Sequence, residues 1–201
     1  MTTIEKIKTL MIRLLGAQNA VSRNAVRLRR AYKMLITMHK GKKMLEICGG
    51  KKPLSNTFIN VDILDYPTVD VVADILKPLP FETHSIDRIV SVATLEHFNV
   101  EDLKTILKEF YRLLKHDGVL EIGVPSLTNI FHYYQEHGCD DLVLRYLHGG
   151  LKDEHDIHLC ILDFKRFKAL MEEAGFGNIE QVDYDFPRHD KAFMMKIRAY
   201  V

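Results

Sequence analysis

A short buried strand that ends in a glycine turn is the feature that most constrains the fold of this chain. It spans Lys43–Gly50, and a second strand soon ends on an acid, at Val61-Asp62. The glycines let a ligand lie against bare backbone, and the acid at the tip of the neighbouring strand can hold the hydroxyl groups of a sugar. This arrangement suits a cofactor that contains a nucleoside.

Strands alternate with helices from residue 42 to the end of the chain. Apolar side chains at helical spacing predict one helix over 103–114, ended by Asp117-Gly118, and another over 164–174, capped by Asp163 and stopped by Gly175. The predicted strands are Met44–Cys48, Phe58–Ile63, Val69–Ala73, Asp87–Val92, Val119–Val124, Asn178–Asp183 and Phe193–Tyr200. The alternation predicts an α/β domain over 42–201, with a mostly parallel seven-stranded sheet and helices on both faces. Residues 126–162 are the least regular part, and we expect an inserted lid or substrate region over the ligand-binding edge of the sheet.

Residues 1–41 are predicted to form a basic helical arm. The net charge of the whole chain is only +1, yet residues 1–43 carry +10 and the remainder carries −9. Three partners for the arm stay open: the chain's own acidic body, an anionic membrane surface reached through residues 1–40, and nucleic acid. Nucleic acid is the least favoured, because the body is acidic and shows no interleaving of aromatic and basic residues.

The sequence predicts a cytoplasmic protein, peripheral to the inner face of the membrane if the arm binds lipid. No apolar run is long enough to span a bilayer, and Met1–Lys6 lacks the layout of a secretory signal. Cys48, Cys139 and Cys160 show no paired spacing and are expected to be reduced thiols. The sequence makes no prediction of the oligomeric state.

Several short motifs occur in a characteristic order along the chain. They include Gly49–Pro53, Ile59–Asp62, Leu95–Phe98, Leu113–Gly118 and Glu172–Phe176. With these motifs, residues 42–201 resemble a class I methyltransferase dependent on S-adenosyl-L-methionine (SAM), of the type 11 kind. The resemblance is strongest to a bacterial subgroup linked to surface-glycan biosynthesis. It implies a Rossmann-like class I methyltransferase fold and SAM as the cofactor.

The chain departs from the pattern of that family in three places. Cys48 stands where the family has the first glycine of the turn, and its Cβ restricts the backbone angles and can crowd the methionine part of the cofactor. The connection between the first two strands is short. Ser126 follows Val124-Pro125, where an acid is usual.

The resemblance also implies which residues hold the cofactor. Those expected around its methionine, ribose and methyl group are Glu46, Cys48, Gly49, Gly50, Asp62 and Ser91. Asp62 would accept hydrogen bonds from both ribose hydroxyls, since a carboxylate offers two acceptor oxygens and no donor. Asp74 would meet the adenine amino group, and Ile75 would cover the ring face. The alternative for Asp62 and Asp74 is a plain structural acid in a turn or loop.

Two histidines are the candidate catalytic residues. His97, in Leu95–Phe98, and His158 match family positions near the reacting groups, and either could take a proton from an acceptor. The alternative for His97 is a structural hydrogen bond that holds its loop. Residues 132–158 contain five histidines, but only His155 and His158 form a spaced pair, so we expect no metal site.

The leading hypothesis is therefore a SAM-dependent methyltransferase that acts on a hydroxyl group of a glycan or of another small polar acceptor. The glycan part rests on the family association alone. One alternative is an RNA methyltransferase that uses the basic arm to bind phosphates. The other is a non-catalytic binding or scaffold protein of the same fold, in which Cys48 has impaired cofactor binding.

Overall fold

A computed structural model describes residues 26, 28–33, 42–152 and 156–201 of the chain. The predicted arm over 1–41 therefore lies largely outside the described residues. The elements are β1 (Met44–Ile47), β2 (Ile59–Asp62), β3 (Val71–Val72), β4 (Ile86–Val92), η1 (Leu95–His97), α3 (Val100–Leu113), β5 (Leu114–Pro125), α4 (Leu127–His137), α5 (Asp141–His148), α6 (Phe164–Ala174), β6 (Gly177–Val182) and β7 (Met194–Tyr200). All seven predicted strands are present, with ends shifted by a few residues.

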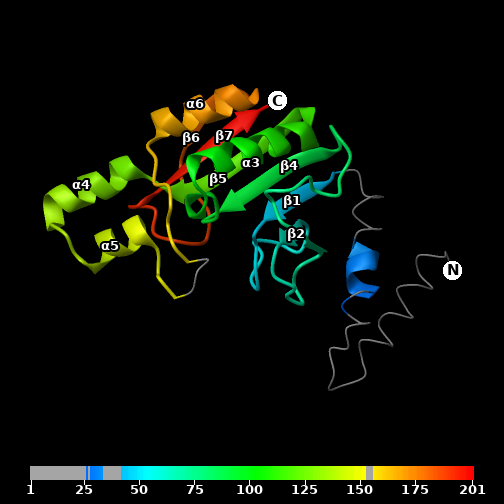
Figure 1. Cartoon of the computed structure of the whole chain (residues 1–201), viewed down its shortest axis with the longest axis horizontal. Coiled ribbons are helices and arrows are strands. Elements are labelled where there is room, and N and C mark those ends of the chain that lie inside the picture. Colours follow the sequence, from blue (N-terminus) through cyan, green and yellow to red (C-terminus); the bar gives the residue numbers. More distant parts are fainter. Residues whose placement is uncertain (1–25, 27, 34–41, 153–155) are drawn as a thin grey trace, which may run out of the picture.

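The strands form one twisted sheet in the order β3-β2-β1-β4-β5-β7-β6 (Figure 1). All pairs are parallel except those of β7, which runs antiparallel to both β5 and β6. The predicted mostly parallel seven-stranded sheet is thus confirmed. The strands β1, β2 and β3 follow one another toward one edge of the sheet, and the chain then crosses back to place β4 on the other side of β1. The carboxyl ends of β1 and β4 therefore flank a topological switch point, where open α/β sheets bind their ligands.

Helices α3 and α6 pack together against one face of the sheet and form the main core with it. Their buried side chains recur at helical spacing: Leu103, Ile106, Leu107 and Phe110 on α3, and Phe167, Leu170 and Met171 on α6. Asp163 caps α6 by accepting a hydrogen bond from the Arg166 amide, and Gly175 ends it in the left-handed conformation, as predicted.

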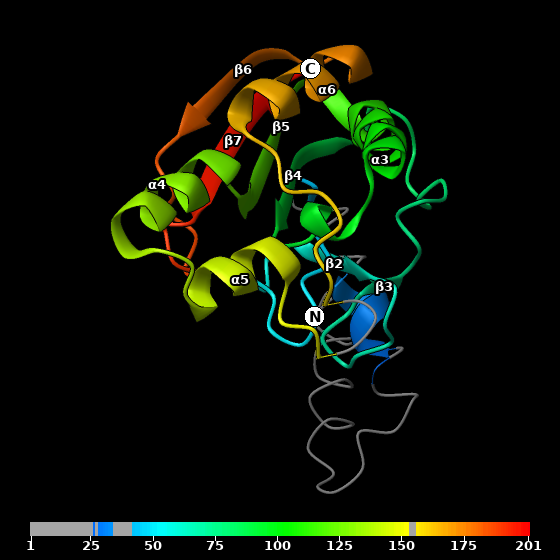
Figure 2. The same ribbon diagram turned by 60° about the vertical axis from the view of Figure 1, so that its left-hand side comes forward.

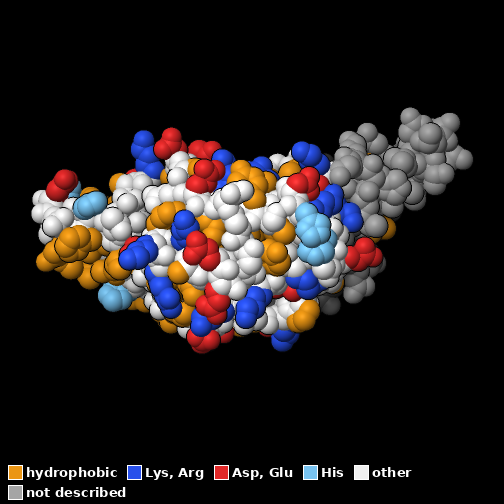
Figure 3. Space-filling view, turned by 90° about the horizontal axis from the view of Figure 1, so that it is seen from above, with side chains coloured by type: hydrophobic (Ala, Val, Ile, Leu, Met, Phe, Trp, Pro, Cys, Tyr) orange, Lys and Arg blue, Asp and Glu red, His pale blue; other side chains and the backbone are white. Residues whose placement is uncertain are grey.

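The opposite face of the sheet carries polar and charged side chains. Leu54 and Phe186, from two loops, pack there on Phe58, Val90 and Val92. Figure 3 shows the molecule from the side of α3 and α6, where acidic and basic side chains are mixed and form no strip of one charge sign.

Two sequence predictions on helices are wrong. The first predicted helix ends at Leu113 and not at Asp117-Gly118, because β5 already begins at Leu114. Asp117 and Gly118 lie in β5 where its register against β4 shifts between Ile86 and Arg88. The segment 126–162 is also more regular than expected, since it contains α4 and α5. These two helices lie side by side, away from α3 and α6 (Figure 2).

The described part of the basic arm contacts the acidic body. Residues 28–33 are helical and lie beside the β2–β3 end of the sheet. Arg29 and Lys33 pair with Asp70 at 3.1 and 2.5 Å, and Arg30 pairs with Asp65 at 2.5 Å. Of the three partners that the sequence left open for the arm, these described residues contact the chain's own body. Within the described residues, no helix combines the length and apolar character that crossing a bilayer requires.

Candidate functional site

The glycine turn after β1 is held by side chains of β2. Gly49 donates its amide hydrogen to Oδ1 of Asn60 at 3.1 Å, and Gly50 donates to Oδ2 of Asp62 at 3.0 Å. Asn60 and Asp62 are two residues apart, so they point to the same face of the strand. Cys48 and Gly50 have φ of 55° and 57°, the left-handed conformation that favours glycine. Cys48 therefore adopts a backbone conformation that residues other than glycine rarely take.

A first cavity of about 310 Å³ opens at the carboxyl ends of β1, β2 and β4. We call it the cofactor cavity; it is lined by Cys48, Asp62, Ile63, Leu64, Ala93, Thr94, His97, Phe98, Ile157 and Leu159. Ile63 and Leu159 are more than half exposed although they are large and apolar. Exposed apolar side chains that gather at the mouth of a cavity are typical of a ligand site.

The thiol of Cys48 lies in the wall of the cofactor cavity and leaves it open. Burial, and after it the nearby carboxylate of Asp62, raises the pKa of this thiol to about 12. The side chain is therefore a neutral thiol at physiological pH. It adds no charge that could disturb a bound cofactor.

The other predicted cofactor residues lie outside this cavity. Glu46 is buried beneath the glycine turn, accepts a hydrogen bond from the Leu54 amide at 2.7 Å, and lies 3.5 Å from the guanidinium of Arg188. Burial raises the pKa of Glu46, although the amide and Arg188 oppose the shift. Ser91 is fully buried at the end of β4, and its hydroxyl has no hydrogen-bond partner among the described residues.

The loop after β3 does not reach the cofactor cavity either. Asp74 accepts a hydrogen bond from the Leu76 amide and pairs with Lys77 at 3.3 Å. Ile75 belongs to the main core. Cys48, Asp62 and His97 thus line one cavity, whereas Asp74 and Ile75 do not line it but follow Ala73, whose amide donates to the Asp62 carbonyl oxygen at 2.9 Å.

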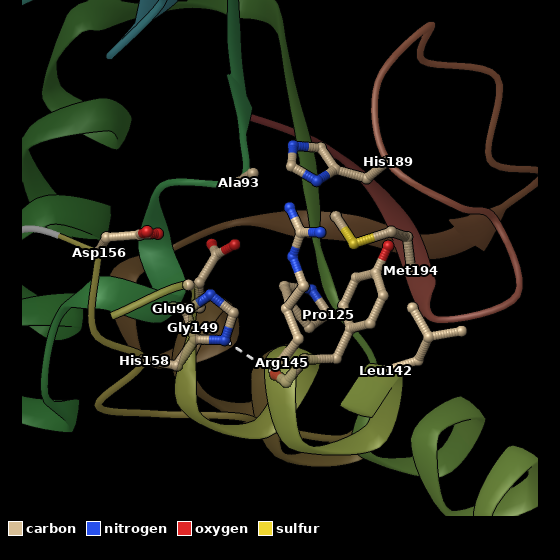
Figure 4. Close-up of a pocket in the computed structure, with 12 residues that line it drawn as sticks. Ala93, Glu96, Pro125, Leu142, Arg145, Gly149, Asp156, His158, His189 and Met194 are labelled. Carbon is tan, nitrogen blue, oxygen red and sulfur yellow. Dashed lines mark hydrogen bonds between the residues drawn. The ribbon is translucent and has the colours of Figure 1, made fainter. Parts of the chain in front are cut away.

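A second cavity of about 360 Å³ adjoins the first, and we call it the acceptor cavity. Its lining is Ala93, Glu96, Pro125, Leu142, Arg145, Tyr146, Gly149, Gly150, Asp156, His158, His189 and Met194 (Figure 4). Ala93, directly after β4, lines both cavities. Sequence reasoning missed Glu96, Arg145 and His189 as site residues. They come from η1, α5 and the β6–β7 loop, and only the fold brings these segments together.

Glu96, His97 and His158 form a cluster where the two cavities meet. A ligand atom of each side chain lies within 4.8 Å of those of the other two, and the imidazole rings are 5.0 Å apart, edge to face. Nδ1 of His97 lies 2.9 Å from the Ile157 carbonyl oxygen, and Nδ1 of His158 lies 2.8 Å from that of Tyr146. A carbonyl only accepts, so each Nδ1 carries the hydrogen, and in the neutral form of the ring Nε2 keeps its lone pair.

Burial sets the charge states in this cluster. Glu96 is almost fully buried, and burial raises its pKa to about 8, so its carboxyl group is largely protonated at neutral pH. One of its oxygens has no hydrogen-bond partner among the described residues. Burial also lowers the pKa of His158, which keeps this imidazole neutral. The cluster therefore offers a neutral acid beside the neutral imidazole of His158.

Comparison with known families gives a match over residues 18–122, just over half of the chain, to a family described as a methyltransferase domain. The match begins within the predicted arm and ends in β5. A search of curated protein sequences finds no match.

Several solved structures with a similar fold are methyltransferases by title. A SAM-dependent methyltransferase from Archaeoglobus fulgidus has a TM-score of 0.55 and 17% identity, over 88% of this chain and 94% of that one. A possible histamine N-methyltransferase from Thermotoga maritima has a TM-score of 0.54 and 16% identity, over 87% and 97%. Human N-acetylserotonin methyltransferase in complex with SAM has a TM-score of 0.54 and 12% identity, over 98% and 55%. At these identities the likeness is one of fold.

Proposed function

The chain belongs to the family of methyltransferase domains, and from this premise we propose that it transfers a methyl group from SAM to a hydroxyl group of a small polar acceptor. The observation that carries the proposal is the pair of adjoining cavities, one largely apolar and one polar, which meet at Ala93. Methyl transfer is an in-line displacement, and it needs a donor site and an acceptor site that open onto each other.

The residues around the cofactor cavity fit SAM, which supplies the methyl group when it is bound. Each carboxylate oxygen of Asp62 accepts one backbone amide, from Gly50 or from Leu64. Each oxygen therefore keeps a further acceptor position for a ribose hydroxyl. The apolar side chains of Leu64, Phe98 and Leu159 suit the faces of an adenine ring.

The acceptor cavity suits a small polar molecule. Arg145, His158 and His189 face into it, and they can bind hydroxyl or acidic groups (Figure 4). Two structural neighbours are named for small substrates, histamine and N-acetylserotonin. We keep a glycan as the expected acceptor class, on the resemblance alone.

A hydroxyl acceptor must lose its proton during the reaction. Its oxygen forms a bond to the methyl carbon while the bond from that carbon to sulfur breaks, and the electron pair of the broken bond stays on sulfur. His97 and His158 are the proposed catalytic residues, since each presents an Nε2 lone pair near the junction of the cavities. Either can accept the proton directly or act on the hydroxyl through a bound ion.

Two observations weigh against the alternatives. The non-catalytic scaffold was suggested because Cys48 replaces a glycine, but the thiol lies in the cavity wall and leaves the cavity open. The RNA methyltransferase was suggested by the basic arm, but Arg29, Arg30 and Lys33 pair with acidic residues of the same chain.

Calorimetric titration with S-adenosylhomocysteine tests the cofactor site. We expect one site per chain and a loss of about 10- to 100-fold in affinity for Asp62→Asn, because hydrogen bonds to a charged group contribute about 1.5–3 kcal/mol. Asp65→Asn is the matched control and should bind like the wild type, because its side chain is 73% exposed and does not line the cavity. No heat at millimolar ligand, or equal affinities for the wild type and Asp62→Asn, would contradict the proposed site.

Transfer of labelled methyl from SAM tests the acceptor class. Hydroxylated small molecules and oligosaccharides should become labelled, and total RNA should not. Labelling of RNA that weakens with rising salt would point to the RNA methyltransferase instead.

A further inference from the structure

We propose that Glu96, His97 and His158 bind one divalent transition-metal ion at the junction of the cofactor and acceptor cavities. The inference deepens the proposed function, because the ion would hold the acceptor hydroxyl beside the site of methyl transfer. It begins from the donor set, which is two imidazole nitrogens and one carboxylate. This set is a recurrent ligand group for Zn²⁺, Fe²⁺ and related ions, and it leaves coordination positions open for other molecules.

The hydrogen bonds of the two histidines match those of metal ligands. A histidine that binds a metal through one ring nitrogen usually donates the hydrogen of the other to a backbone carbonyl or a carboxylate. Nδ1 of His97 donates to Ile157, and Nδ1 of His158 donates to Tyr146. These contacts fix the tautomer of the neutral rings in which Nε2 is free to coordinate a metal.

Glu96 supplies the independent observation. It is 3% exposed, and one of its oxygens has no hydrogen-bond partner among the described residues. Figure 4 shows its carboxyl group pointing into the acceptor cavity next to the ring of His158. A buried polar atom without a partner needs an explanation, and an ion at this point provides one.

Backbone contacts hold the three ligands in place. The amides of Leu159 and Cys160 both donate to the Glu96 carbonyl oxygen, at 2.8 and 3.1 Å. They tie the segment of His158 to η1, which carries Glu96 and His97. Ligand atoms around a zinc ion stand about 3.4 Å apart, since each lies about 2.1 Å from the metal. In the structure, the ligand atoms of Glu96, His97 and His158 lie within 4.8 Å of one another, so binding an ion would have to bring them closer by little more than an ångström. Rotation of the side chains can provide this movement.

The ion would act on the acceptor as a Lewis acid. It binds the hydroxyl oxygen at an open position and makes that hydroxyl more acidic, so that its proton can leave to water in the cavity. The resulting alkoxide oxygen attacks the methyl carbon. Two neighbouring open positions favour an acceptor with a second oxygen next to the hydroxyl that is methylated, such as a vicinal diol.

The experiment measures metal binding directly and without an acceptor. The full chain is stripped with EDTA and titrated with Co²⁺, followed by its visible absorption, and with Zn²⁺, followed by calorimetry. We expect one ion per chain. Glu96→Gln and His158→Gln should each weaken binding by at least about tenfold. His189→Gln, which alters another histidine of the same cavity, should leave the metal affinity unchanged.

The affinity for S-adenosylhomocysteine, measured on the same proteins, separates a failure of the metal site from a failure of the methyltransferase proposal. The side chains of Glu96 and His158 line the acceptor cavity, so their variants should still bind S-adenosylhomocysteine, which shows that they are folded. If the wild type binds S-adenosylhomocysteine but no ion, or if the cluster variants bind ions as well as the wild type does, the metal site is refuted while the methyltransferase proposal stands. If ions bind to the cluster but S-adenosylhomocysteine does not bind at all, the methyltransferase proposal fails instead.

Discussion

The residues of the glycine turn show why the backbone must come so close to β2. A Cβ atom added to Gly49 would lie 2.6 Å from Oδ1 of Asn60 and 2.9 Å from the carboxyl carbon of Glu46. Both neighbours are buried and hydrogen-bonded, so neither can move freely. Position 49 is therefore restricted to glycine by close approach, whereas Gly50 is required for its positive φ.

Gly49→Ala is expected to lower the free energy of unfolding by about 1–3 kcal/mol, the usual effect of overpacking a filled interior. It should also weaken S-adenosylhomocysteine binding, since Asn60 must shift away from the turn. Gly177→Ala is the matched control, because a Cβ there meets no atom within 4 Å. Urea unfolding followed by circular dichroism measures both variants. Equal unfolding midpoints for the two would show that the turn is looser than the structure implies.

Cys48 should react slowly with thiol reagents. Only the thiolate reacts, and burial together with Asp62 raises the pKa of this thiol to about 12. Cys139 is exposed and should be modified first when the protein is treated with an alkylating agent at pH 8. Mass spectrometry of peptides taken at successive times gives the order of modification. Labelling of Cys48 as fast as that of Cys139 would contradict its buried, neutral state.

Residue identity alone predicted one part of the site well and another poorly. Cys48 and Asp62 were found from the glycine turn and the strand ends, and His97 from the family resemblance, and all three line one cavity. Glu96 was missed, because a glutamate in a short 3-10 turn gives no sign that it will be buried. Only the pairing of η1 with the segment around Leu159 encloses it.

Among the helices, those that bury more apolar side chains were easier to predict from the sequence. Helices α3 and α6 bury a full apolar stripe, so their spacing was evident. Helix α4 buries mainly Ile130, and α5 buries mainly Val143. One buried residue in a helix leaves no repeating apolar pattern in the sequence. Their start signals were present nonetheless, since Ser126 and Asp140 each cap a helix.

The adjacent strands β4, β5 and β7 are also joined by charges on the face opposite α3 and α6. Glu121 on β5 is buried and pairs with Lys196 at 2.9 Å, with Arg198 at 3.0 Å, and with Arg88. Burial acts to raise the pKa of Glu121, but the hydrogen bonds from Lys196 and Arg88 outweigh it and lower the pKa below its usual 4.5. Its folded pKa is thus below its unfolded pKa. The stabilisation is full above about pH 4.5 and is lost as the pH falls through the folded value.

Glu121→Gln should therefore destabilise the fold at pH 7 by about 3–5 kcal/mol, because it leaves buried Lys196 without its buried counter-charge. The difference from the wild type should shrink at acidic pH, where Glu121 of the wild type also becomes neutral. Chemical denaturation at a series of pH values measures it. A difference that is independent of pH would show that lost packing, and not charge, is responsible.

For the whole molecule, the uneven charge finds a partial explanation in contacts between arm and body. Asp70 is buried, pairs with Arg29 and Lys33, and accepts a hydrogen bond from the Asn60 amide at 2.9 Å. Asn60 in turn holds the amide of Gly49. The arm is thereby connected to the turn that would bind the cofactor through two buried side chains. This connection was beyond sequence analysis, which gave the charge imbalance but not the partner of the arm.

Asp70→Asn tests this connection at the level of the whole chain. It should lower the free energy of unfolding by about 1.5–3 kcal/mol, because Arg29 and Lys33 lose a charged hydrogen-bond partner but are themselves partly exposed. It should also weaken S-adenosylhomocysteine binding, since Asn60 loses the carboxylate that accepts its amide hydrogen. Asp65→Asn is the matched control: Asp65 also pairs with the arm, through Arg30, but its side chain is 73% exposed, so we expect a loss of about 1 kcal/mol or less and no change in affinity. Urea unfolding and calorimetry on both variants measure these effects. If both variants bind S-adenosylhomocysteine like the wild type, the arm stabilises the fold but does not position the glycine turn. The basic residues of the arm would then act in a contact that does not involve the cofactor site.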